Sequence, residues 1–455
     1  ELRGDVVGAQ FEALGLAPLG DPLTTTHALT PTMTATTAPT IATASLITVT
    51  ATPTSTGAVT GTRPISEPVS RLAHALAIPR DYVQRFPISR TQLVSVPVLT
   101  LLDSDGDVLY TFTYHDEFVD RAGAGAAQGE LIWTRADRSL DGVDFGGGIA
   151  LYRRVSFSRA LAEQLEEHGA SGVVIVTETE AKNLPSEHLR FEPGDEAGIP
   201  VVKITEATFE ALLAQLDMTP RDLLSTPPVL PLGVQVRAVI ARTPVTRALT
   251  ANVLGFLPGS DPRLANEVIL IGAHYDHAGQ SPGDLYFPGA NQNGSGVAAM
   301  LELARIWQSS GYRPARSVLF AAWGAEEKNS AGVTRYLEDP VVPLADTVSV
   351  IALDRIAGGG GHKLLFYGTR ENDQALIQCV ESGAHQLERR TWRRGSTGEG
   401  WHEPFNQAGI PTVKFIWDRA EEVAYSPDDT AAALDPERLA NSGEILVLTI
   451  SWLAR

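Results

Sequence analysis

The stretch from Glu267 to Glu327 decides the fold. It reads EVILIGAHYDHAGQ (267–280), PGANQNGSGVAAMLELARIW (288–307) and RSVLFAAWGAEE (316–327). Val268–Ile271 and Ser317–Ala322 are short apolar runs, which predict two buried strands. Between them, apolar residues recur at helical spacing after Gly294. Two parallel strands joined by a helix form a βαβ unit, which places ligand sites beyond the carboxyl ends of its strands.

Polar side chains gather where these two strands end. His274, Asp276 and His277 follow the first strand, and Glu326 and Glu327 follow the second. Imidazole and carboxylate groups brought together are the materials of a metal-dependent hydrolase. The sequence therefore predicts a hydrolase-type site at this edge of the sheet.

The composition narrows the class of protein. The 455 residues suffice for two or three domains, and the net charge of -18 argues against non-specific binding to nucleic acid. The single cysteine, Cys379, excludes an internal disulfide framework. No apolar run is long enough to span a bilayer. Because the sequence begins at Glu1 without methionine, we expect a leader to have been removed.

The N-terminal region divides into two parts. Residues 1–21 predict a short helix with Phe11 and Leu14 on its apolar side. Residues 22–64 are rich in Thr, Ala and Pro and carry no charge before Arg63, as expected of a linker. The alternative is an extended edge segment, because Ile47–Thr50 favours β-structure.

Limited proteolysis tests the linker interpretation. We expect cleavage first within residues 22–64, because this composition offers few large apolar anchors, and we expect the part of the chain that carries the polar motifs to remain intact. Strong protection across Ile41–Thr50, read by mass spectrometry of the fragments, would instead indicate a strand of a sheet.

The rest of the chain alternates strands and helices. We expect a helix at Val69–Ala77 and a hairpin over residues 94–114 around the turn DSDGD, followed by strands and helices through residue 219. Further strands are expected at 249–256, 348–353 (ending at Asp354), 363–367 and 412–416, with a last helix at 436–453. The predicted fold is α/β: a mixed, mostly parallel sheet sandwiched by helices, with an inserted lobe.

Five motifs carry a family resemblance: HYDH, PGANQNGSG, WGAEE, ALDRI and WHEPFNQAGIP, in this order. At these residues the chain resembles the secreted zinc aminopeptidases related to aminopeptidase Y, whose fold is shared by glutaminyl cyclases and the transferrin-receptor ectodomain. The resemblance covers the chain from about Ala251 onward, with a weaker match at the N-terminus. It implies a zinc exopeptidase fold and an extracytoplasmic or secreted location.

The resemblance also suggests a domain plan. Residues 1–21 are expected to be an N-terminal segment of the peptidase-like domain, and residues 231–455 its main part. Residues 65–230 form an inserted region, within which about 93–225 resemble a protease-associated domain. Such a lobe serves substrate access or partner binding, or is a passive structural unit.

The resemblance assigns roles residue by residue. Family members hold two zinc ions bridged by an Asp. His274 and Asp354 match ligands of one ion, and Glu327 matches a ligand of the other. Glu326 matches the general base, and Asp276 matches the carboxylate that orients the ligand His.

Two positions depart from the family pattern. Gln292 stands where the bridging Asp is expected, and Tyr425, in AYSPDDT, stands where a late His ligand is expected. A neutral amide does not bridge two dications well, and a phenol with a pKa of about 10 is an uncommon zinc ligand. The metal site is thus degenerate, with two of five ligands replaced.

Several outcomes remain open at such a site. His402 or His277 would serve as a third ligand, oxygen donors would accept a hard cation such as calcium, or Tyr425 would act as an acid. Without metal, crowded carboxylates recruit a proton or a basic side chain, such as Arg355 or Lys328. Gln292 and Tyr425 would then be hydrogen-bond partners of those carboxylates.

Two functions follow from these readings. One is a zinc-dependent aminopeptidase that removes N-terminal residues from peptides, with Glu326 as base and a modified metal site. The other is an inactive pseudopeptidase that binds a peptide or protein, a fate with a precedent in the transferrin-receptor ectodomain. A glutaminyl cyclase is less favoured, because its zinc relies on the two replaced positions, 292 and 425.

Overall fold

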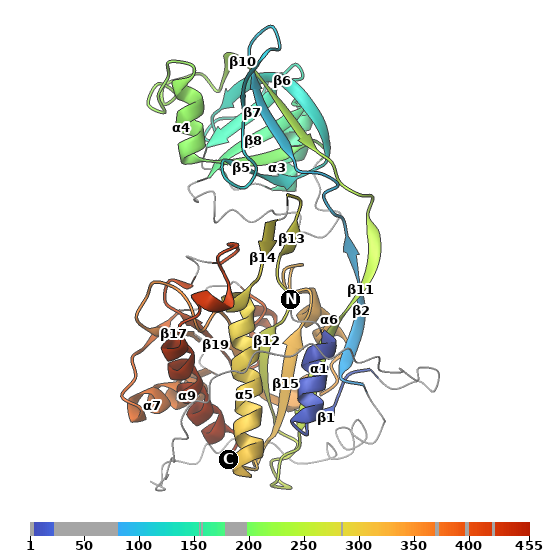
Figure 1. Cartoon of the computed structure of the whole chain (residues 1–455), viewed down its shortest axis with the longest axis vertical. Helices are drawn as coiled ribbons and strands as arrows, with labels where there is room; N and C mark the ends of the chain where they lie inside the picture. Colours follow the sequence, from blue (N-terminus) through green and yellow to red (C-terminus); the bar gives the residue numbers. More distant parts are fainter. Residues whose placement is uncertain are drawn as a thin grey trace.

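The computed structural model describes residues 4–21, 81–153, 155, 158–177, 198–283, 285–368, 373–395, 400–420 and 424–455. They form a large domain on a nine-stranded sheet and a lobe on an eight-stranded sheet, with the lobe above the large domain (Figure 1). This mixed α/β architecture agrees with the predicted fold class. Residues 22–64 and the helix expected at Val69–Ala77 lie outside the described residues.

The sheet of the large domain has a parallel centre and antiparallel flanks. Its order is β1-β11-β15-β12-β16-β19-β17-β18, and β2 also pairs with β11. The run β15-β12-β16-β19 is parallel, whereas β11 and β17 run antiparallel to their inner neighbours. The strands are β1 Ala17–Pro18, β2 Val83–Arg90, β11 Thr246–Leu257, β12 Val268–His274, β15 Ser317–Trp323, β16 Thr347–Leu353, β17 Leu364–Tyr367, β18 Thr391–Arg394 and β19 Thr412–Trp417.

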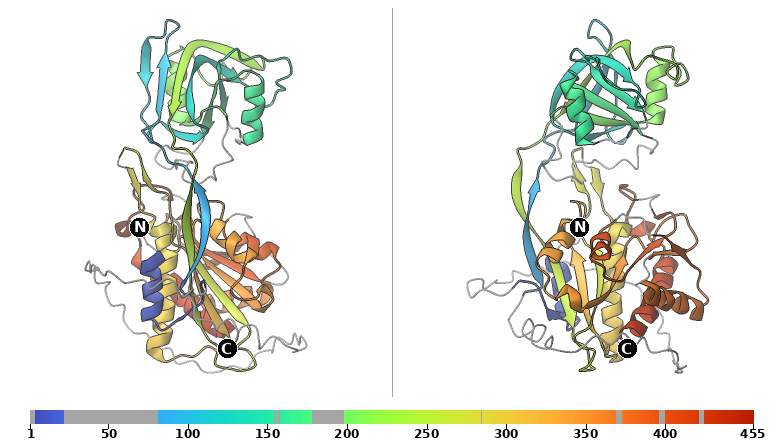
Figure 2. Two further views of the ribbon diagram at one scale, coloured as in Figure 1. Left: turned by 90° about the vertical axis from the view of Figure 1, so that its right-hand side faces the viewer. Right: turned by 180° about the vertical axis from the view of Figure 1, so that it is seen from behind.

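Helices cover both faces of this sheet. One face packs on α1 Gly4–Ala13, α5 Ser295–Ser310, α7 Gln374–Gln386 and α9 Pro436–Leu453, and the other on α6 Ala331–Glu338 and α8 Glu403–Gln407. Figure 2 shows α1 in blue and α5 in yellow on the same side of the sheet. Among the described residues, no helix has the length and apolar character needed to cross a membrane.

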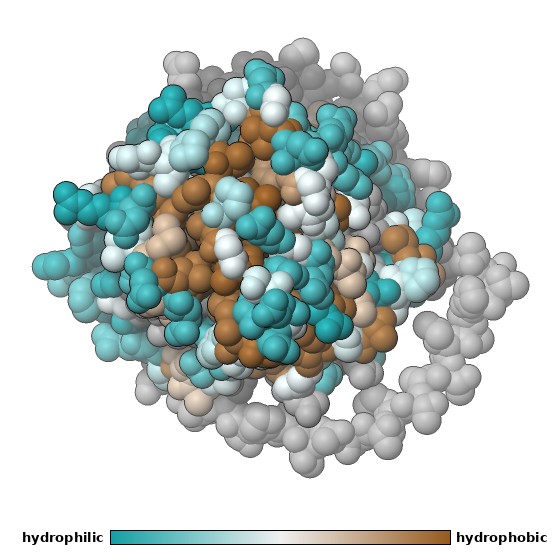
Figure 3. All heavy atoms as spheres, turned by 90° about the horizontal axis from the view of Figure 1, so that it is seen from above, coloured by the Kyte–Doolittle hydropathy of each residue, from teal (hydrophilic) through white to brown (hydrophobic). Residues whose placement is uncertain are grey.

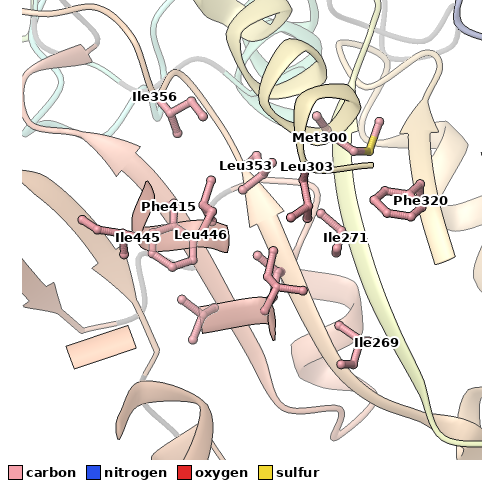
Figure 4. Packing of buried hydrophobic residues seen from close by; sticks show 14 of the residues in the cluster. Ile269, Ile271, Met300, Leu303, Phe320, Leu353, Ile356, Phe415, Ile445 and Leu446 are labelled. Carbon is pink, nitrogen blue, oxygen red and sulfur yellow. The ribbon is translucent and has the colours of Figure 1, made fainter. Parts of the chain in front are cut away.

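The hydrophobic core between the large sheet and the helices α5 and α9 accounts for the apolar runs in the sequence. Met300 and Leu303 of α5 face Ile271 and Phe320 of the central strands, and Leu446 of α9 lies against Phe415 (Figure 4). Each large apolar side chain buried in this way contributes roughly 1.5–3 kcal/mol to stability. The continuous apolar strands are therefore fixed at the centre of the sheet.

The lobe has its own sheet and its own cores. Its order is β4-β3-β10-β6-β7-β8-β9-β5, and β6 to β9 are parallel. Buried apolar side chains form one cluster on each face of this sheet. The elements are β3 Val98–Leu102, β4 Val108–Thr111, β5 Phe118–Ala122, β6 Gly125–Thr134, β7 Ile149–Arg153, α3 Arg159–Glu167, β8 Gly172–Thr177, β9 Val201–Thr205, α4 Glu206–Ala214 and β10 Val229–Ile240.

The hairpin expected around DSDGD is confirmed. β3 and β4 pair antiparallel, and Gly106 occupies the turn with a φ of 89°, which glycine adopts without strain. All residues of β4 are exposed because β4 is an edge strand of the lobe. Apolar side chains therefore reach the surface here, and the view onto the lobe from above shows apolar patches between polar residues (Figure 3).

Two strands join the domain and the lobe. β2 pairs with β11 along a register from Val83↔Val253 to Arg90↔Thr246, and this long ribbon rises along one side of the molecule (Figure 1). The sequence analysis did not expect β2, whose Pro87 weakens the strand signal, although proline is tolerated on a strand with one partner. It also divided the chain between residues 230 and 231, whereas β10 crosses that position and belongs wholly to the lobe sheet.

A small hairpin of the large domain touches the lobe. It consists of β13 Gly279–Ser281 and β14 Leu285–Phe287 and follows the HYDH segment (Figure 1). The His115 Nε2 atom lies 3.3 Å from Ser281 Oγ, and the His115 ring is edge-on to Phe287, with 5.6 Å between centroids. The lobe is therefore held near the edge of the large sheet at which the polar motifs gather.

Candidate functional site

The predicted site residues converge at the carboxyl ends of the parallel strands. β12 and β15 pair in register from Val268↔Ser317 to His274↔Trp323, so the segments that follow them leave the sheet together. Asp354 directly follows β16 on the other side of β12. His274, Glu327 and Asp354 are all buried. The apolar strands thus present polar groups at one edge, as α/β sheets commonly do.

Glu327 is surrounded by three side chains that hydrogen-bond its carboxylate. Tyr425 donates its hydroxyl proton to Glu327 Oε2 at 2.7 Å, and Gln292 Nε2 donates to Oε1 at 3.4 Å. His277 Nδ1 lies 3.1 Å from the same Oε1, so this nitrogen carries the proton when the carboxylate is ionised. The expectation that Gln292 and Tyr425 hydrogen-bond a carboxylate is confirmed.

The His277 ring also stacks on Tyr425. Their centroids are 5.2 Å apart and the rings are inclined by 27°. Of the two additional histidines considered from the sequence, His277 is the one that contacts Glu327.

Asp354 is paired with a basic side chain. The Arg355 guanidinium donates to Asp354 Oδ2 at 3.1 Å. Burial alone would raise the pKa of the Asp354 carboxyl, but Arg355, Lys414 and His274 outweigh it and lower this pKa to about 2. Of the two basic side chains expected to fold inward, Arg355 is thus the one that neutralises Asp354.

A backbone oxygen holds His274. Its Nδ1 lies 2.9 Å from the carbonyl oxygen of Asp276, and 3.9 Å from the Asp276 carboxylate. That carboxylate accepts the backbone N–H of Glu326 at 3.1 Å. Burial raises the pKa of Asp276 to about 7; His274 opposes the shift, and Glu326 and Glu327 add to it. Asp276 therefore links the first motif to the Glu pair.

The loop that carries Gln292 is held by a residue whose role the sequence analysis missed. Asp429 is fully buried and accepts the backbone N–H groups of Asn291 at 2.7 Å and Gln292 at 3.0 Å. Asn293 Nδ2 in turn donates to the Leu353 carbonyl at 2.7 Å. The only sequence signal was the position of Asp429 in the PDDT segment after Tyr425.

His402 lies in a different environment. It is buried, and its Nε2 is 4.0 Å from Glu403 Oε2. Burial lowers the pKa of His402 to about 3; Lys414 adds to the shift and Asp354 opposes it. His402 is therefore neutral at physiological pH, on the side of the site where Lys414 lies.

Comparisons with known proteins identify the group to which this architecture belongs. Residues 252–450, which carry all of these site residues, match the family model of Peptidase family M28. This segment of the chain, residues 252–450, is therefore similar to peptidase family M28. Aminopeptidase YwaD of Bacillus subtilis is 26% identical over 317 residues, which is 68% of this chain and 62% of that protein.

Two further proteins are similar to this chain. The solved structure of BSAP, a zinc aminopeptidase from Bacillus subtilis, superposes with a TM-score of 0.57 at 22% identity, covering 82% of this chain and 84% of that one. Mouse transferrin receptor protein 2 is 24% identical over 406 residues, 72% of this chain and 49% of that protein. The chain thus spans only about half to three fifths of the length of these curated relatives.

At the positions where the family resemblance implies zinc ligands, the side chains of this chain form hydrogen bonds and an ion pair with one another. A catalytic zinc takes three protein ligands. No group of three or more His, Cys, Asp or Glu side chains arranged to hold a metal occurs within the described ranges. Gln292 and Tyr425 act as hydrogen-bond donors, and Asp354 bonds a guanidinium. The donor set suits hydrogen-bonded carboxylates better than a pair of dications.

Proposed function

We propose that this chain binds a peptide or protein at the carboxyl edge of its large sheet without hydrolysing it. The observation that carries the proposal is the Arg355–Asp354 ion pair at a position matching a metal ligand. A cation already neutralises that carboxylate, and a nearby zinc ion would be repelled by the guanidinium. The pseudopeptidase alternative is thus favoured over a working dinuclear enzyme.

The site retains polar atoms suited to a bound ligand. Gln292 Oε1 and His277 Nε2 are buried and have no hydrogen-bond partner among the described residues. A buried polar atom without a partner carries a free-energy cost, which a ligand or water relieves by pairing with it. Gln292 Oε1 can accept a hydrogen bond from a backbone N–H of a peptide. His277 Nε2 can accept such a bond, or donate one to a backbone carbonyl when it carries a proton.

The lobe completes the proposed binding region. Its contact with the β13–β14 hairpin holds it beside this edge, and we propose that it corresponds to a protease-associated domain involved in ligand access. The alignment with a transferrin receptor over 72% of this chain supports a binding role. An extracytoplasmic or secreted location, implied by the family resemblance, is part of the same proposal.

Metal analysis of the purified full chain, with no zinc added, tests this proposal. We expect substoichiometric zinc and no hydrolysis of aminoacyl-nitroanilides, because Asp354 and Glu327 are already bonded to protein groups. Two tightly bound zinc ions together with turnover would refute the pseudopeptidase proposal.

A second candidate is a weakly active zinc aminopeptidase with Glu326 as general base. It is favoured by the retention of His274 and by the Asp276 bond to the Glu326 N–H, which positions that residue at the site. If nitroanilides are hydrolysed, Glu326→Gln should lower the rate on the order of 10²-fold or more. Circular dichroism should first show that the Glu326→Gln variant is folded as the parent is. If the hydrolysis rate of this folded variant equals that of the parent, Glu326 is not the base.

A further inference from the structure

A basic surface lies on an edge strand of this acidic chain. The segment Arg389–Arg394 reads RRTWRR, whereas the whole chain has a net charge of -18. Its four arginines are exposed, and Trp392 is 48% exposed, so the segment faces solvent. We call Lys363, Arg390, Trp392, Arg393 and Arg394 the β18 surface.

Few carboxylates neutralise this surface. Arg389 pairs with Glu444 at 2.9 Å, and Arg393 Nε donates to the Gly368 carbonyl at 3.2 Å. Within the described residues, Lys363, Arg390 and Arg394 form no ion pair with a carboxylate. Their charges are therefore available to an external anion.

Two of these cations contact one indole ring. Lys363 Nζ lies 3.9 Å from the Trp392 ring centroid, and Arg394 Cζ lies 4.7 Å from it. Each cation–π contact is favourable alone. Together, however, the two contacts place two positive charges around one ring, and these charges repel each other. A carboxylate bound beside Trp392 would offset that repulsion and would gain two charge-assisted hydrogen bonds.

The backbone of β18 is also available on one side. β18 pairs with β17 in parallel register, Leu365↔Trp392, and is the last strand of the sheet among the described residues. Its neighbour β17 lies on the opposite side of the domain from β2 (Figure 1). An edge strand presents N–H and C=O groups that pair with an added strand.

Charge decides which strand can be added. Charged side chains commonly protect an edge from pairing, and arginines here disfavour a second copy of β18 through like-charge repulsion. The same charges favour an acidic chain. Nucleic acids or sulfated glycans share the negative charge but cannot form the ladder of backbone hydrogen bonds that an edge strand offers.

We propose that the β18 surface binds an extended acidic peptide segment, which adds to the large sheet as its outermost strand. Alternate residues of a strand share one face. Alternate carboxylates of the peptide therefore meet Arg394 and Lys363 around Trp392, and backbone hydrogen bonds fix its direction. β18 contains none of the residues of the carboxyl-edge site, so this inference holds whether or not that site binds a peptide.

The test uses the full chain and a fluorescein-labelled octapeptide of alternating Glu and Thr, with binding followed by fluorescence polarisation. We expect saturable binding that weakens as salt rises, and no binding of the matching Lys–Thr peptide. Arg394→Glu should weaken the affinity by about tenfold, because it replaces an attraction with a repulsion. The control Arg263→Glu, at an 84% exposed arginine between β11 and β12, should bind as the parent does.

Three results would overturn the proposal. The first is absence of binding by the parent, or equal binding by Arg394→Glu. The second is equal binding of an octapeptide N-methylated at alternate residues, which would exclude strand addition because those N–H donors are lost. The third is equally tight, Arg394-dependent binding of an oligonucleotide or a heparin fragment of the same charge, which would indicate a general polyanion site.

Discussion

The double substitution Gln292→Asp with Tyr425→His is expected to raise the affinity for zinc by orders of magnitude. In the parent, both side chains donate a hydrogen bond to Glu327 and neither supplies a negative or strongly coordinating donor. The variant supplies a carboxylate and an imidazole at the positions of the family ligands, beside His274, Glu327 and Asp354. Metal binding free energy depends on such a complete, deprotonated ligand set.

Competition with a chromogenic chelator measures this affinity. A matched control is Gln128→Asp with Tyr110→His, which makes the same chemical changes at two exposed positions of the lobe and should leave zinc binding unchanged. A parent that already binds two zinc ions as tightly as the double variant would contradict the degenerate site. A double variant with no gain would show that positions 292 and 425 are not the replaced ligands.

The second large effect is expected at Arg355. Its side chain is 19% exposed and that of Asp354 is 10% exposed, so the pair is largely withdrawn from water. Arg355→Ala leaves Asp354 charged and without its guanidinium partner in this environment. We expect the free energy of unfolding to fall by about 3–5 kcal/mol at neutral pH, as when one partner of a buried pair is removed. Urea unfolding followed by tryptophan fluorescence measures the change.

Two further variants serve as comparisons for the unfolding free energy of Arg355→Ala. Arg305→Ala breaks the exposed pair with Glu302, whose side chains are 56% and 50% exposed, and should cost no more than about 1 kcal/mol. Adding Asp354→Asn to Arg355→Ala removes the unpaired charge and should recover part of the loss. If Arg355→Ala costs no more than Arg305→Ala, the Asp354 carboxylate does not depend on Arg355.

Several strands and helices, and the residues of the candidate site, could be predicted from the sequence alone. The continuous apolar runs gave β12 and β15, DSDGD gave the β3–β4 hairpin, and the last helix was predicted with the bounds it has, Pro436–Leu453. Each of these signals depends on neighbouring residues only: a buried strand needs an unbroken apolar run, and a hairpin needs its turn. The positions of His274 at the end of β12 and of Glu327 beyond the end of β15 followed from the same local patterns.

Tertiary structure decided what depends on residues distant in the chain. The pairing of β2 with β11 and the place of β10 in the lobe sheet join segments far apart in sequence, and strand partners leave little local signal. The sequence offered Arg355 or Lys328 for the inward cation, and His277 or His402 for the added histidine. The fold brings Arg355 to Asp354 and His277 to Glu327, because charge and hydrogen-bonding needs in a buried site are met by whichever side chain packing places within reach.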